Sequence, residues 1–107
     1  MRLNDWNIEQ ICGYKPITTF YTDFSIADRF GYGAIEDTYN RCKKHWCDNY
    51  KYLTELVMVL NWKIWEHYDS GNELFAKLYD ELWKELSEYA MDNLKGDELS
   101  YYFRTTD

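Results

Sequence analysis

One stretch of the chain decides its fold: YKYLTELVMVLNWKIWEHY, residues 50–68. Apolar side chains recur in it at steps of three and four residues, at Tyr50, Leu53, Val57, Leu60 and Ile64. Because an α-helix turns once in about 3.6 residues, this spacing places all of them on one helical face. We expect a helix over residues 49–69, and we expect it to be the most buried helix of the protein.

A second apolar stripe precedes this helix. It is formed by Ile35, Tyr39, Cys42 and Trp46. No Gly or Pro interrupts residues 34–68, but the stripe slips at the step from Trp46 to Tyr50, where Asp48-Asn49 would suit a helix cap. The sequence therefore predicts two helices, 34–47 and 49–69, and leaves one bent helix as the alternative.

The C-terminal part of the chain predicts one long helix and one short helix. From Glu73 to Leu94 the apolar residues again follow helical spacing, with Asn72 placed as a cap and Gly96 as a stop. Asp97 can then cap a short helix that ends at Phe103.

The N-terminal part is less regular. A short helix is predicted over residues 6–12, and Pro16 with its Thr-rich surroundings predicts an extended loop over residues 14–24, with a short strand as the alternative. Ser25 is expected to cap a short helix through Phe30, with Asp28 at the capping-box position, before Gly31-Tyr32-Gly33 breaks it. The expected fold is all-α, a single domain over residues 1–107 that forms a compact helical bundle of about five to six helices with short N- and C-terminal helices.

Composition agrees with a folded helical domain. The chain has 107 residues, 46% hydrophobic and 20% aromatic, with only one Pro and five Gly. Such a chain can bury a sizeable core, and β-domains usually need more turn residues. Three Cys make a poor disulfide framework, and neither a signal peptide nor a membrane-spanning run is recognisable. We therefore expect a cytoplasmic protein that does not enter a membrane.

The net charge of −7 is confined to one part of the chain. Residues 1–65 carry 8 acidic and 8 basic side chains, whereas residues 66–107 carry 11 acidic and 4 basic ones. An acidic surface disfavours contact with a phosphate backbone, and it suits a solvated face or a site for a basic partner. The candidate interaction residues are the carboxylates of the long helix and two terminal tyrosines: Asp80, Glu81, Glu85, Glu88, Asp92, Tyr101 and Tyr102.

Residue patterns for catalysis or metal binding fail on spacing. Cys42, His45 and Cys47 lie close together, but Cys47 is about 140° from Cys42 around a helix and no second Cys pair follows. His67 is flanked by Glu66 and Asp69, which near a helix end is more typical of a surface arrangement. We therefore expect no catalytic residue, no metal, no cofactor and no enzymatic activity.

Residues 25–46 also suggest a helix-turn-helix. Ala27 and Gly31 occupy positions typical of its first helix and turn, and Arg41, Lys43 and Lys44 offer a weak basic face. Glu36 and Asp37 oppose this, because they lie where such a helix would meet DNA. A DNA-binding regulator is therefore the alternative to a protein-binding module.

Short length, acidity, many aromatic residues and the lack of an enzyme motif together give a general resemblance to small uncharacterised accessory proteins of phages and mobile elements. The resemblance extends over the whole chain, and no defining motif carries it. It implies a role in host–element interaction, such as inhibition of a host nucleic-acid-binding protein. The many aromatic residues also make a homodimer plausible.

Overall fold

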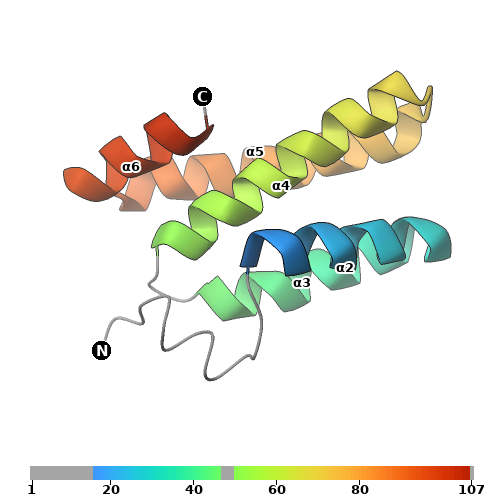
Figure 1. Ribbon diagram of the computed structural model, residues 1–107, viewed down its shortest axis with the longest axis horizontal. Helices are drawn as coiled ribbons and strands as arrows, with labels where there is room; N and C mark the ends of the chain where they lie inside the picture. Colours follow the sequence, from blue (N-terminus) through green and yellow to red (C-terminus); the bar gives the residue numbers. More distant parts are fainter. Residues whose placement is uncertain (1–15, 47–49, 107) are drawn as a thin grey trace.

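The computed structural model describes residues 16–46 and 50–106, and these form a bundle of helices without a strand. The helices are α2 (Pro16–Phe30), α3 (Tyr32–Trp46), α4 (Tyr50–Asp69), α5 (Glu73–Asn93) and α6 (Asp97–Thr106). Figure 1 shows two antiparallel hairpins, α2 with α3 and α4 with α5, and α6 folded back beside the first half of α4. The all-α bundle expected from the sequence is confirmed. The short helix expected over residues 6–12 lies outside the described residues.

Helix α4 is the centre of the bundle, as its apolar stripe predicts. It packs against α2, α3, α5 and α6. Leu53, Leu56, Val57 and Leu60 are almost completely buried in the core. Their burial removes a continuous apolar face from water, which is the main favourable contribution to folding.

Helix α2 differs from the expected extended loop over residues 14–24. Pro16 is its first residue, a position where the missing N–H of proline has no helical partner to lose. Phe20, Phe24 and Ala27 follow at helical spacing and are buried. Tertiary packing of this face therefore outweighs the low helix propensity of the Thr-rich segment. Ser25, expected as a helix cap, lies in the middle of the helix.

The break between α2 and α3 needs only Gly31. Its φ of 94° lies in the left-handed region that favours glycine, whereas Tyr32 and Gly33 already belong to α3. Residues 34–69 contain two separate helices, which excludes the single bent helix. The linker residues 47–49 lie outside the described part of the chain.

The C-terminal elements follow the sequence prediction closely. The Asn72 side chain accepts a hydrogen bond from the Phe75 backbone N–H at 3.5 Å, and α5 ends just before Leu94. Helix α6 begins at Asp97 as expected and continues three residues beyond Phe103, to Thr106. No helix among the described residues is both long enough and apolar enough to cross a membrane.

Candidate functional site

A buried polar network joins α2, α4 and α5 around the carboxylate of Asp28. Oδ2 of Asp28 lies 3.0 Å from Lys63 Nζ and 3.0 Å from His67 Nε2, both on α4. Oδ1 accepts a hydrogen bond of 2.5 Å from the hydroxyl of Tyr79 on α5. Three elements therefore meet at one carboxylate, and both of its oxygens are occupied.

Lys63 is the most deeply buried charged side chain in this network. It is 1% exposed, and its ammonium lies 3.3 Å from Glu66 Oε2 and 4.7 Å from the ring centre of Tyr21. Two carboxylates and an aromatic face thus compensate the cost of taking its charge out of water.

Aromatic rings enclose the other side of the network. The ring of His67 stacks on that of Tyr79 at 5.5 Å, and the edge-to-face contact of Phe75 with His67 has a centroid distance of 5.3 Å. Burial and the hydrogen bond to Asp28 raise the pKa of Tyr79 well above its usual value, because both favour the protonated hydroxyl. Tyr79 therefore remains a hydrogen-bond donor throughout the physiological range.

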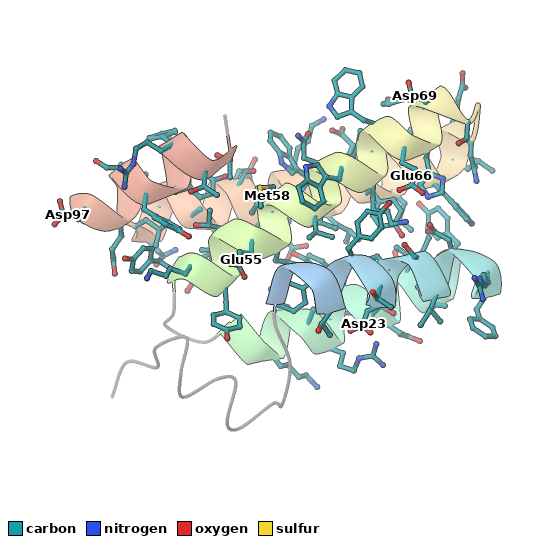
Figure 2. All side chains as sticks on the ribbon, viewed as in Figure 1. Asp23, Glu55, Met58, Glu66, Asp69 and Asp97 are labelled. Atoms are coloured by element: carbon teal, nitrogen blue, oxygen red, sulfur yellow. The ribbon has the colours of Figure 1, made fainter. Side chains whose placement is uncertain are left out.

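An open groove lies beside this network on the outer side of α4. It has a volume of about 550 Å³ and is lined by Tyr21, Trp62, Trp65, Glu66 and Asp69. Figure 2 shows Glu66 and Asp69 near the C-terminal end of α4, with Glu66 on the side that faces α2. Residues 62, 65, 66 and 69 share one helical face because they are separated by three, four and seven residues.

The groove is connected to the buried network through Glu66. The hydroxyl of Tyr21 donates to Glu66 Oε2 at 2.6 Å, and this hydrogen bond, followed by burial, raises the pKa of Tyr21. The rings of Tyr21 and Trp62 meet edge to face at 6.1 Å. The wall of the groove that Tyr21 forms is therefore held in place by contacts with the buried network. The wall that Trp65 forms is 62% exposed.

The five candidate carboxylates of α5 differ in whether they form an ion pair. Asp80 pairs with Lys84 at 3.0 Å, and Glu85 pairs with Lys43 of α3. Within residues 16–46 and 50–106, the remaining three carboxylates form neither an ion pair nor a hydrogen bond; they are Glu81, Glu88 and Asp92. The structure thus leaves three of the five predicted carboxylates open to a partner.

The two terminal tyrosines belong more to the fold than to the surface. Tyr102 is 5% exposed, and its hydroxyl donates to Ser87 Oγ at 3.1 Å. Tyr101 is half-buried and meets the ring of Tyr50 edge to face at 5.3 Å. Both tyrosines attach α6 to the neighbouring helices, and Tyr102 has almost no surface to offer.

Sequence reasoning missed the buried network, although a signal for it was present. Lys63 and His67 continue the apolar stripe of α4 beyond Leu60 at spacings of three and four residues, so a charged and a titratable residue occupy core positions. His67 is accordingly buried instead of lying on the surface. Its partner Asp28, expected at a capping-box position, lies within α2 and contacts α4 and α5 instead.

The structure also places the residues considered for metal and DNA binding. Burial raises the pKa of the Cys42 thiol to about 12, while the side chains of His45 and Cys47 lie outside the described part. The described residues contain no group of three potential metal ligands. Helices α2 and α3 are antiparallel and separated only by Gly31, whereas a helix-turn-helix uses a longer turn and a steep crossing angle.

Comparisons with protein-family models, curated proteins and solved structures found no match to this chain.

Proposed function

We propose that this protein is a non-enzymatic interaction module that binds a partner with a basic surface. The observation that carries the proposal is the groove on α4, where exposed aromatic rings lie beside two carboxylates. Trp and Tyr are common anchors of protein interfaces, because they bury a large area while their polar atoms stay satisfied.

The exposed aromatics of α4 are well placed for such an interface. Trp62, Trp65 and Tyr68 are 44%, 62% and 48% exposed, on a helix whose opposite face is fixed in the core. A rigid anchor loses little conformational entropy when it binds, so more of the contact energy appears as affinity. Charge supports a basic partner, because the net charge is −7.

The buried network supports a non-enzymatic role. Both oxygens of Asp28 already contact other side chains of the network. His67 is 8% exposed and is covered by the rings of Phe75 and Tyr79. Groups held in this way stabilise the arrangement of three helices. They are poorly placed to exchange a proton with a substrate, since a general acid or base must come within hydrogen-bond reach of it.

The acidic row of α5 would assist the encounter. Glu81, Glu85, Glu88 and Asp92 are exposed and fall at steps of three and four residues along one side of the helix. Like charges at such spacing oppose helix formation slightly, but they strengthen the attraction of a basic partner over distance. In the cytoplasm of a host, a nucleic-acid-binding protein would offer such a basic surface to a phage or mobile-element accessory protein.

The proposal is tested with three labelled peptides of equal length, one basic, one neutral and one acidic, titrated with the protein at low and at physiological salt. We expect the basic peptide to bind best and its affinity to fall as salt rises. The triple variant E81K/E85K/E88K should slow association, because electrostatic attraction speeds the encounter of the two molecules. The double variant W62A/W65A should speed dissociation, because contacts buried in the complex determine how long it lasts.

Equal affinity for the basic and neutral peptides would reject the proposed function. An unchanged association rate in the triple variant would show that α5 does not contribute to binding, and the groove would remain as the binding surface.

A further inference from the structure

We propose that the groove on α4 is a binding site for one arginine side chain of the partner. This inference rests on the proposed function and specifies what the groove recognises. Three features support it: the chemistry of the walls, the free acceptor atoms and the local charge.

The walls suit a flat cation. Trp62, Trp65 and Tyr21 line the groove, and the indole ring is the aromatic system that attracts cations most strongly. A guanidinium is planar and weakly hydrated, so it can stack on such a ring with less loss of hydration than an ammonium. The fold already places one cation against this aromatic cluster, since Lys63 Nζ lies 4.7 Å from the ring centre of Tyr21.

The groove also offers hydrogen-bond acceptors without competing partners. Oε2 of Glu66 is occupied by Tyr21 and Lys63, but its Oε1 accepts no hydrogen bond from any described residue. Asp69 forms no ion pair within the described helices and lines the same groove. A guanidinium carries five N–H donors in a fork and can serve two carboxylates at once, whereas an ammonium is a compact point charge.

The local charge excludes an anionic ligand and favours a cation. Asp28, Glu66 and Asp69 supply three carboxylates against the one ammonium of Lys63, so the acidic groups outnumber the lysine beside the groove. Lys63 cannot turn outward to neutralise the groove without breaking its contacts with Asp28, because it is 1% exposed. A phosphate would therefore be repelled, and an incoming arginine would reduce the excess of negative charge.

The test compares three peptides that differ at one position, which is arginine, lysine or the neutral arginine analogue citrulline. Binding to the full chain is measured by calorimetry, and the indole N–H signals of Trp62 and Trp65 are followed by NMR. We expect the arginine peptide to bind about tenfold more tightly than the citrulline peptide and several-fold more tightly than the lysine peptide. Its binding should shift both indole signals.

Matched variants separate the groove from general acidity. D69N in the groove and D92N on α5 each remove one exposed carboxylate that forms no ion pair with a described residue. D69N and W65A should each weaken the arginine peptide by about tenfold, whereas D92N should change it by less than about twofold. Circular dichroism confirms that each variant keeps its helical content.

The outcomes distinguish this inference from the proposed function. If arginine and lysine peptides bind equally well and W65A weakens both, the basic-partner function stands and arginine selectivity is wrong. If W65A and D69N leave arginine binding unchanged while E81K/E85K/E88K abolishes it, the partner binds on α5 and the groove site is wrong. If no peptide binds, both proposals are wrong.

Discussion

At the scale of single residues, Lys63 shows how a buried charge fixes the arrangement of helices. Its ammonium contacts Asp28 from α2 and Glu66 from its own helix, so it joins two elements that are distant in sequence. A hydrophobic pair of the same volume could be equally stable, since desolvation offsets much of the attraction between buried charges. The ion pair adds specificity for one arrangement of the helices, because a different register of α2 on α4 would leave a charge buried without a partner.

Removing the charge of Asp28 should therefore destabilise the protein strongly. D28N leaves Lys63 with only Glu66 as its counter-charge, and we expect a loss of about 3 kcal/mol in the free energy of unfolding. The control is D23N on the same helix, which removes a carboxylate that lies 4.0 Å from the exposed side chain of Arg41. That surface pair should contribute less than about 1 kcal/mol. Urea unfolding measures both, and similar losses would show that Lys63 does not depend on Asp28.

The residues of the groove could be predicted only in part. Glu66 and Asp69 stood out beside His67, whereas Trp62 and Trp65, at the edge of the α4 stripe, were not assigned to a site. That Tyr21 would join them could not be inferred, because its segment was expected to be extended. The contact between Tyr21 of α2 and Glu66 of α4 connects positions 45 residues apart, and local spacing carries no information about such pairs.

At the scale of elements, the bundle is built from helix pairs whose connections are very short. One residue, Gly31, separates α2 from α3, and a turn that includes Gly71 separates α4 from α5. Connections this short oblige neighbouring helices to run antiparallel. The geometry of each hairpin is therefore set by a glycine whose backbone adopts a positive φ.

Two glycines two residues apart should respond to alanine with opposite signs. Gly31 has a φ of 94°, which a residue with a Cβ adopts only with strain, so G31A should destabilise the protein by about 1–2 kcal/mol. Gly33 is helical, and a Cβ added there meets no atom within 4 Å. G33A should therefore stabilise the protein by about 0.5 kcal/mol. Thermal unfolding of the two variants decides, and a loss of stability in both would contradict the assignment of the break to Gly31 alone.

The contrast between α2 and α5 explains which elements the sequence could predict. Helix α5 combines an apolar stripe with the Asn72 cap and a glycine after its end, so its local signals agree with its packing. In α2 the local signals oppose the packing, because Thr and Pro residues lower helix propensity while Phe20 and Phe24 require a buried face. The spacing of the two phenylalanines by four residues indicated a helix, but the low helix propensity of the surrounding residues favoured a loop.

At the scale of the whole molecule, the core contains several groups that can lose a proton. Tyr39, Tyr52, Tyr79 and Cys42 are each at most 2% exposed, in a bundle with a radius of gyration of only 13.6 Å. A content of 20% aromatic residues favours the burial of some of these rings, because so many large side chains cannot all lie on the surface of a small domain. The distribution of charge was equally predictable, whereas the few polar groups inside the core were not.

This core should make the protein sensitive to alkali. Burial raises the pKa of the Cys42 thiol from its ordinary 9.0 to about 12, so above pH 9 the unfolded chain releases a proton that the folded chain retains. The contribution of Cys42 to stability is complete below pH 9 and is lost as pH rises toward 12, by about 1.4 kcal/mol per pH unit. The buried hydroxyls of Tyr39 and Tyr79 act in the same direction, but only above their ordinary value of 10.0.

The variant C42A separates these contributions. Its overall stability will fall because a cavity replaces the thiol, but that offset does not depend on pH. The measurement is therefore the change in the free energy of unfolding between pH 9 and pH 10, from urea titrations of both proteins. We expect the wild type to lose about 1 kcal/mol more than C42A over this interval, and the contributions of the other cysteines cancel in the comparison. Parallel pH profiles would mean that water reaches the thiol in the folded protein, and the packing of α3 against the core would then be looser than its 2% exposure at Cys42 implies.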